Sequence, residues 1–352
     1  MSPLLWQRLA ALSLGLCGLI IDAQAAGPML AAAGLDAPGL IKRVQDASQR
    51  RSFNGTFVIS AAGQMSSSHI IHFGDGQNQV ERIDSLDGQM RQVFRHNDEV
   101  HVLWPRAHLM SIEQREAVRD FPATISTEAS HPLDLYEIQT SSHSERIAGY
   151  EAQVVLLKPR DALRFAQRWW LERDSGLLLR TDMLGEHGEV LESAAFSSLQ
   201  IGVRVSPQPL LQEMNRLDGY KVSRPVLLPT HLDREGWSLR VPVTGFRPIS
   251  CVRRPGSQFA REPASASAPL NLAGNSAEAD TMLQAIYSDG LTHVSIFIEP
   301  YRADASQTET QLVMGATHAV TRRQGDWWIT AVGDVPPLTL RQFVQALERR
   351  KP

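Results

Sequence analysis

Histidine and glutamate side chains within one short stretch are the first candidates for chemistry. The stretch DGLTHVSIFIEP, residues 289–300, begins with an Asp-Gly turn signal and then alternates apolar and polar residues. This alternation is typical of a half-buried β-strand. His293 and Glu299 are six residues apart, so they share one face of the strand but stand about 20 Å from each other. They cannot act as one acid–base pair, and the stretch therefore predicts a strand that presents a surface.

The other histidines do not form a recognisable catalytic or metal-binding pattern. His69 and His72 are three residues apart on a predicted strand, so their side chains point to opposite faces. His101 and His108 are separated by Trp104-Pro105, and we find no carboxylate or cysteine at ligand spacing from them. A Gly-rich phosphate loop, a nucleophile elbow and an H-E-x-x-H sequence are all missing. The sequence therefore predicts no enzyme, no metal site and no cofactor.

The first 25 residues have the composition of a secretory signal. Arg8 precedes an apolar run, residues 10–21, that is too short to span a bilayer, and Ala23-Gln24-Ala25 follows as a cleavage site. Cys17 could instead be lipidated, but a large residue precedes it where a small one is expected. The mature chain would keep only Cys251, so it must fold without an internal disulfide. We expect an exported and soluble protein.

Length and charge narrow the class of protein further. The chain has 352 residues, of which 43% are apolar, and this predicts two domains with sizeable cores. Residues 26–200 hold 17 Lys and Arg against 23 Asp and Glu, whereas residues 201–352 hold 17 against 14. This asymmetry is either ordinary surface variation or a sign that the second half meets an anionic partner. Export and a net charge of only −3 disfavour nucleic-acid binding.

The first half indicates one helix followed by a series of antiparallel strands. Residues 37–51 place Leu40, Ile41 and Val44 on one helical stripe. From Phe53 the apolar period changes to two, and tight turns join the strands without helices between them. About ten such strands predict a strongly curved half-barrel sheet with helices on its concave face. An insertion with three prolines, residues 104–132, interrupts the sheet and includes a short helix predicted at residues 111–121.

The second half indicates a smaller α+β domain. Residues 203–230 hold four prolines and predict a linker after a first domain at 36–202. The second domain, 231–352, contains a loop rich in Ala, Ser and Pro at 254–279, which we expect to be mobile. A short helix is predicted at 279–289, and a closing helix at 337–350 carries Leu340, Phe343, Val344 and Leu347 on one face.

Apolar side chains repeat at alternate positions along the predicted strands of the first domain. They form either a packed core between sheet and helix or a concave cavity that holds acyl chains. The second interpretation predicts a lipid-binding set made of Phe57, Ile59, Trp104, Phe165, Trp169 and Leu179.

Several short stretches in both halves occur in the order of one known family. They are SFNGTFV (52–58), RWWLERDSGLLLRTDML (168–184), GEVLESAAFSSLQIG (188–202), GF (245–246), SDGLTHVSIFIEP (288–300) and ITAVGDVP (329–336). In these stretches the chain resembles the RseB/MucB family of periplasmic regulators of the envelope-stress response of sigma-E type. The resemblance implies a mainly β chain whose first domain has the LolA/LolB-like lipid-carrier fold and whose smaller α+β domain binds the partner.

The same resemblance implies a role. Members of this family bind the periplasmic part of a membrane anti-sigma factor of the RseA/MucA type and shield it from site-1 proteolysis, until lipid or lipopolysaccharide releases it. A periplasmic lipid or lipoprotein carrier with an accessory domain is the alternative. Residues 202–352 discriminate between the two roles, because a simple carrier needs only the curved sheet. Arginines present a fixed fork of donors to carboxylates or lipid phosphates. We therefore predict partner contacts at Arg253, Arg254, Arg322 and Arg323.

Overall fold

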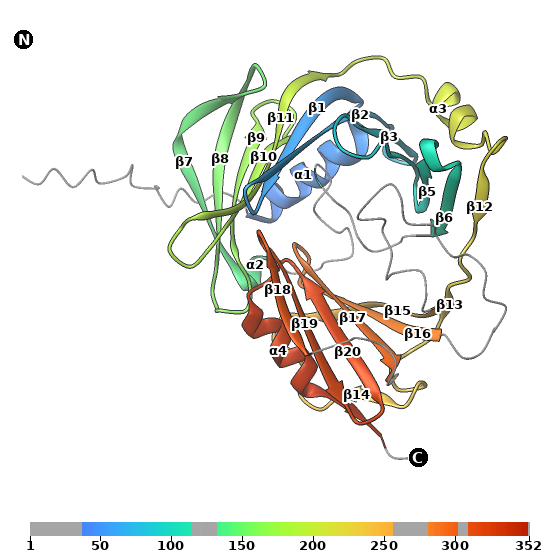
Figure 1. Cartoon of the computed structure of the whole chain (residues 1–352). Coiled ribbons are helices and arrows are strands. Elements are labelled where there is room, and N and C mark those ends of the chain that lie inside the picture. The colour runs from blue at the N-terminus through green and yellow to red at the C-terminus, as the bar shows by residue number, and fades with distance from the viewer. Residues whose placement is uncertain (1–36, 115–120, 122–131, 256–280, 302–308, 351–352) are drawn as a thin grey trace, which may run out of the picture.

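The computed structural model describes residues 37–114, 121, 132–255, 281–301 and 309–350. Most of these residues lie in two sheets, one of which arches over the other (Figure 1). The predicted export segment, residues 1–25, lies outside the described residues, as do most of the proline-containing insertion and of the predicted mobile loop. Among the helices that are described, none is long and apolar enough to cross a membrane.

The first sheet has twelve strands within the described residues and curves into a half-barrel (Figure 1). The predicted curved antiparallel sheet is therefore confirmed. Its strands are β1 (Phe53–Ala61), β2 (Gln64–Gly74), β3 (Gln79–Ser85), β4 (Gln92–His96), β5 (Glu99–Trp104), β6 (Leu109–Gln114), β7 (Tyr136–Ile147), β8 (Tyr150–Pro159), β9 (Ala166–Glu172), β10 (Leu178–Leu184), β11 (Val190–Ile201) and β12 (Lys221–Ser223).

Strand order across this sheet is β12-β6-β5-β4-β3-β2-β1-β11-β10-β9-β8-β7, so β12 and β7 are its edges and β1 lies in the middle between β2 and β11. All pairs are antiparallel except β12 with β6. The register between β1 and β11 shifts at Thr56 and Phe57, and such a bulge increases local twist and bending. At Gly55 a Cβ atom would lie 2.5 Å from the Ser198 carbonyl oxygen, so only glycine fits where these two strands approach each other.

Helix α1 (Ala37–Arg50) packs against the concave face of the first sheet (Figure 1). Its buried Leu40, Ile41 and Val44 belong to the same core as Phe53 and Trp169, which point inward from the sheet. The short helix α2 (Pro132–Leu135) precedes β7, and a 3-10 turn, η1 (Pro105–Ala107), joins β5 to β6. The expected helical filling of the concave face is thus provided by α1.

Helix α3 (Pro207–Met214) lies on the outer face of the first sheet. Met214 packs there against Phe94, Leu103 and Met110. The ring nitrogen Nδ1 of buried His101 is 2.9 Å from the Met214 carbonyl oxygen. Residues 203–230, predicted as a linker, therefore contain this helix, β12 of the first sheet and β13 (Leu228–Pro229), which pairs with the second sheet.

The second sheet has seven strands within the described residues, in the order β13-β15-β16-β17-β20-β19-β18. Helix α4 (Pro337–Ala346) covers one of its faces, and Leu340 and Phe343 share a core with Ile296 and Ile329. The predicted closing helix is confirmed as far as Ala346. The other elements are β14 (Trp237–Leu239), β15 (Arg247–Pro255), β16 (Thr281–Ser288), β17 (His293–Pro300), β18 (Thr310–Met314), β19 (Thr317–Gln324), β20 (Trp327–Gly333) and β21 (Leu347–Arg349).

Two helices predicted from the sequence are wrong. Residues 281–288, expected to be helical, form β16, which pairs with β15 on one side and β17 on the other. Residues 111–114, at the start of another predicted helix, belong to β6, and the rest of that helix lies outside the described residues apart from Phe121. Short apolar runs fit a helical and a strand period equally well, and strand pairing with distant neighbours decides between them.

Candidate functional site: a cavity between the two sheets

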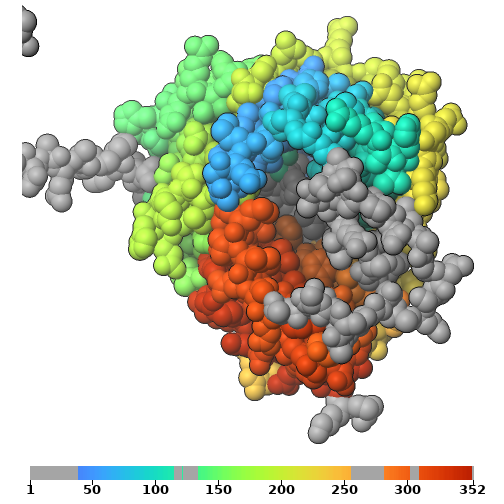
Figure 2. Space-filling view, viewed as in Figure 1, coloured from blue at the N-terminus to red at the C-terminus, as the bar shows by residue number. Residues whose placement is uncertain are grey.

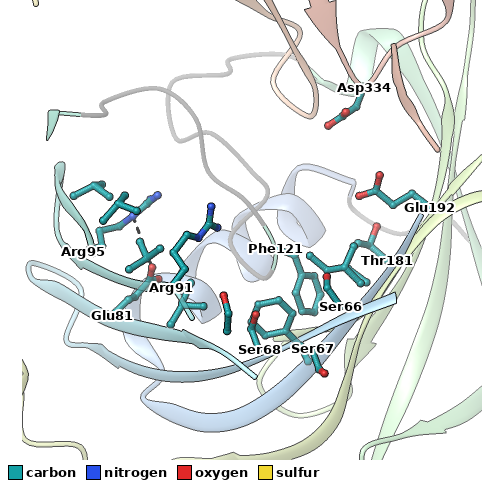
Figure 3. Close-up of a pocket in the computed structure, with 18 of the residues that line it drawn as sticks. Ser66, Ser67, Ser68, Glu81, Arg91, Arg95, Phe121, Thr181, Glu192 and Asp334 are labelled. Carbon is teal, nitrogen blue, oxygen red and sulfur yellow. Dashed lines mark ion pairs between the residues drawn. The ribbon is translucent and has the colours of Figure 1, made fainter. Parts of the chain in front are cut away.

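A cavity of about 690 Å³ lies between the concave face of the first sheet and the start of β17. Its lining comes from β1 to β6, from β9 to β11, and from the second domain at Leu291, Thr292, His293 and Asp334. Figure 3 shows Asp334 reaching the cavity from the opposite side to Ser66, Ser67 and Ser68. The concave face is therefore part filled core, under α1, and part open cavity.

The floor of the cavity is aromatic. The ring centroids of Phe57 and Phe121 are 5.6 Å apart, and those of Phe121 and Phe196 are 5.3 Å apart. Figure 3 shows Phe121 at the centre of the site. Ile59 and Ile83 extend the apolar lining on either side. This part of the cavity can accept an apolar group without leaving polar atoms unpaired.

A row of three polar side chains leads from the core to one wall of the cavity. His72, Glu81 and Arg95 are register partners on β2, β3 and β4, so they share a face. His72 Nδ1 is 2.9 Å from Glu81 Oε1. Arg95 Nε is 3.8 Å from Glu81 Oε2 (Figure 3). His72 is 1% exposed and stacks on Phe53 with ring centroids 4.6 Å apart. The row holds Arg95 beside the cavity, where its guanidinium can meet an anionic group.

Hydroxyl groups line the rim between this wall and the floor. Ser66, Ser67 and Ser68 come from β2, and Ser85 comes from β3. The Asp87 carboxylate accepts hydrogen bonds from the Ser67 hydroxyl and backbone N–H, and these bonds hold the pKa of Asp87 below its usual value. The bonds also fix the β3–β4 turn against β2. A site with an apolar floor, a charged wall and a hydroxyl rim suits an amphiphilic ligand.

The predicted lipid-binding residues are divided between this cavity and the core. Phe57, Ile59 and Trp104 line the cavity. Trp169 and Leu179 are fully buried in the core with α1, and Phe165 packs against His318 of the second domain at 5.7 Å between ring centroids. The structure thus brings three of the six to the cavity. Their role in lipid binding stays a prediction.

Sequence reasoning missed the polar part of the site. Ser66, Ser85, Glu81 and Arg95 were not singled out, because polar residues on a strand are normally solvent-facing. The only signal for them would have been the pairing register of β2, β3 and β4, which turns scattered residues into neighbours. His101 also has a carboxylate partner that was missed: its Nε2 is 2.7 Å from Glu99 Oε1, two residues away on β5.

The predicted partner-binding arginines lie in two separate places. Arg253 and Arg254 are on β15, whereas Arg322 and Arg323 are on β19, with three strands between them. Arg253 forms an ion pair of 2.7 Å with Glu235, and Arg254 is buried and donates to Gln284 Oε1. Arg322 and Arg323 are both exposed. These partner contacts stay a prediction, and the structure does not join the four residues into one patch.

A buried joint holds the second domain against the first, next to the cavity. Arg164 Nε is 2.9 Å from Asp289 Oδ2, and the same oxygen accepts a hydrogen bond from the Tyr136 hydroxyl. Burial raises the pKa of Tyr136 well above its usual range, so this hydroxyl stays a donor. Leu163 lies in the core of the second domain, while Leu291 lies in the core of the first. Each domain thus inserts a leucine into the other.

Comparison with known proteins identifies the same architecture elsewhere. The model of the MucB/RseB N-terminal domain matches residues 36–214, and that of the MucB/RseB C-terminal domain matches residues 231–348. The sigma factor AlgU regulatory protein MucB of Pseudomonas aeruginosa is 28% identical over 317 residues, which are 86% of this chain and 87% of that protein. The sigma-E factor regulatory protein RseB of Escherichia coli K12 is 23% identical over 312 residues, 88% of this chain and 89% of that protein.

Among solved structures, the crystal structure of MucB in complex with MucA(peri) has a TM-score of 0.64 and 24% identity. The match covers 90% of this chain and all of that one, so the two share a fold. The two family models together include α1, α3, α4 and the strands of both sheets except β12 and β13, which lie between the matched ranges. This chain therefore belongs to the MucB/RseB family.

Proposed function

We propose that this chain is a periplasmic negative regulator of the envelope-stress response, which binds the periplasmic part of a membrane anti-sigma factor and shields it from site-1 proteolysis. The observation that carries this proposal is the family match in both domains. The curated relatives are named as sigma-factor regulatory proteins, and one solved relative is a complex of MucB with MucA(peri). A lipid carrier would need only the curved sheet, whereas the family relationship extends to residue 348.

The joint between the domains supports the same proposal. A carrier with a loosely attached accessory domain would need no buried contacts across the boundary. Here Arg164 and Asp289 pair with neither side chain exposed, and the Thr339 hydroxyl donates to the Leu163 carbonyl oxygen across the same boundary. The two domains therefore present one continuous surface on which a partner can be held.

In this proposal, the lipid or lipopolysaccharide that releases the anti-sigma factor binds in the cavity. Its volume of about 690 Å³ is within the usual range for small-molecule sites, and its floor is apolar while Arg95 and Glu81 stand on its wall. We assign acyl-chain contacts to Phe57, Ile59 and Trp104, with the headgroup of a lipid or lipopolysaccharide toward the charged wall. Because Thr292 and His293 of the second domain also line the cavity, a bound lipid touches both domains.

The test uses the purified mature chain and the periplasmic segment of its cognate anti-sigma factor. Titration calorimetry should show a complex that forms without added metal or nucleotide. In a digestion assay, the mature chain should slow cleavage of the anti-sigma segment by the site-1 protease. Absence of a complex at tens of micromolar, or cleavage at the same rate with and without the chain, would overturn the proposal. Export is checked separately by fractionation of cells that express the full chain.

A further inference from the structure

Strand β18 forms an unusual edge of the second sheet. It is the last strand in the sheet order, so one side of its backbone has no neighbouring strand within the described residues. All five of its residues are exposed, and Leu312, Val313 and Met314 are exposed by 65, 61 and 62%. Proteins normally protect such an edge with charges, prolines or a bulge. The sequence TQLVM contains no charge and no proline, so within the part of the chain that the structure describes these five residues carry none of the usual devices against strand pairing.

At the Met314 end of β18, the turn into β19 contacts the first domain. The β18–β19 turn is so close to the first sheet that a Cβ atom on Gly315 would lie 2.9 Å from Ala61 Cβ. Figure 2 shows the orange residues of the second sheet directly against blue residues of the first. Near this contact, at the ends of the first sheet's strands, Met65 and Val190 are exposed by 72 and 50%. The apolar edge therefore continues toward exposed apolar residues of the other domain, and such patches mark interaction sites.

The other end of the strand carries two arginines and one carboxylate, because Glu309 Oε1 accepts a hydrogen bond from the Arg323 backbone N–H. Thr310 pairs with Thr321, and the next two residues of β19 are the exposed Arg322 and Arg323. The Arg323 guanidinium stacks over the Tyr301 ring at 3.6 Å, which fixes its position. The Arg322 side chain points to the face covered by α4, because Arg322 pairs with the core residue Ile329. A segment that lies along β18 would thus meet apolar side chains first and guanidinium groups at one end.

We infer that the β18 edge is the docking site at which an extended segment of the anti-sigma partner adds to the second sheet as an eighth strand. In this mode the backbone hydrogen bonds supply affinity, and alternate side chains supply specificity. Leu312 and Met314 point to one face of the sheet and Val313 to the other, so the segment should carry apolar residues on both faces. Its acidic residues should lie beside Arg322 and Arg323. The inference rests on the proposed function and adds the surface and the chemistry of the partner segment.

The test compares lysine substitutions on the edge with a matched substitution elsewhere. Lysine on an edge strand opposes pairing with another strand. Leu312→Lys and Val313→Lys, separately and together, are compared with Val241→Lys, because Val241 is 58% exposed in the same domain but lies outside β18. The anti-sigma periplasmic segment is the probe, and thermal unfolding confirms that each variant is folded. The double variant should bind at least tenfold more weakly than the parent chain, and Val241→Lys should bind within twofold.

Two further measurements separate strand addition from other contacts. Backbone amides of residues 310–314 should become protected from hydrogen exchange when the anti-sigma segment binds. Arg322→Glu should weaken binding, whereas Arg234→Glu, at an exposed position away from β18, should leave it unchanged. If the parent chain binds the segment but neither the exchange nor the lysine variants respond, the docking site is wrong and the proposed function stands.

If the parent chain does not bind the segment at all, the proposed function fails and the docking site fails with it. A third outcome would identify a different occupant. If sedimentation shows that the parent chain alone self-associates, and Leu312→Lys abolishes this while anti-sigma binding is unchanged, the edge holds a second copy of the chain and the inference is overturned.

Discussion

Arg164 and Asp289 come from different domains and form an ion pair of 2.9 Å in which neither side chain is exposed to solvent. Arg164 also donates from Nη2 to the Thr244 carbonyl oxygen and from Nη1 to Asp161, so the charge is well satisfied. Two residues after Asp289, the same turn inserts Leu291 into the first core, and Thr292 and His293 line the cavity. Residues 289–293 therefore contribute both to the contact between the two domains and to the lining of the candidate ligand site.

The first prediction concerns this ion pair. Asp289→Ala should lower the free energy of unfolding by about 3–5 kcal/mol, because it removes the fully buried one of the two carboxylates that pair with Arg164 and leaves the buried Tyr136 hydroxyl without its acceptor. Urea denaturation followed by tryptophan fluorescence measures the change. Because the lost ion pair joins the two domains, the domains of the variant should also unfold in separate steps, whereas the parent chain should unfold in one step.

The matched control breaks an ion pair of similar length near the surface. Arg253 is 2.7 Å from Glu235, and its side chain is 48% exposed. Arg253→Ala should therefore cost no more than about 1 kcal/mol. If Asp289→Ala and Arg253→Ala cost the same, the joint at Arg164 does not hold the domains together.

A second prediction tests β17, in which apolar and polar residues alternate along the sequence. Ile296 is fully buried in β17 between β16 and β20, so Ile296→Ala should lower the free energy of unfolding by about 2–5 kcal/mol. Ser295→Ala, at a half-buried position on the other face of the same strand, is the control and should cost less than 1 kcal/mol. Equal losses for the two variants would contradict the assignment of the buried face.

A feature of this fold can be predicted from the sequence when a local pattern of residues determines it. It cannot be predicted in this way when contacts between distant residues determine it. Alternation of apolar residues identified β17 and the inward face of β1, because a strand with one buried face has apolar residues at every second position. β16 was mistaken for a helix, because Thr281–Ser288 has apolar residues that fit both periods. Only its two neighbours in the sheet, β15 and β17, determine that it is a strand.

The candidate site was less predictable than the fold, for a related reason. Trp169 was correctly placed on the same face as Phe57, but the sequence does not show that α1 covers one and leaves the other beside the cavity. The pairing of Glu81 with Arg95 depends on register, and the pairing of Arg164 with Asp289 depends on how two domains dock. Neither relationship leaves a local pattern in the chain.

A third prediction concerns the cavity. Ile83 lines it and packs against the core that contains the aromatic floor, so Ile83→Trp should fill part of the volume and weaken binding of a fatty acid or lipid A at least fivefold. Titration calorimetry with the mature chain measures the affinity. Val226→Trp is the control, because Val226 is 65% exposed and lies outside the cavity lining, and it should bind lipid as the parent chain does. Unchanged affinity in a folded Ile83→Trp variant would show that lipid binds elsewhere or not at all.

The last prediction uses the single cysteine among the described residues. Burial, with a smaller contribution from the negative charge of Glu235, raises the pKa of the Cys251 thiol from 9.0 to about 11. The thiolate is the reactive form, so at pH 8 iodoacetamide should modify the folded chain far more slowly than the urea-unfolded chain. The rate in the folded chain should keep rising as the pH increases toward 11.

The raised pKa of Cys251 also makes the free energy of unfolding depend on pH. Between pH 9 and 11 the unfolded chain has lost the thiol proton while the folded chain keeps it, so the free energy of unfolding falls as the pH rises through this range. Below pH 9 both states keep the proton and the thiol contributes no pH dependence. Cys251→Ser removes the ionisable group, so its stability should fall less steeply than that of the parent chain above pH 9. Parallel curves for the two proteins, together with fast modification of the folded chain at pH 8, would show that Cys251 is not held in the half-buried position that β15 gives it.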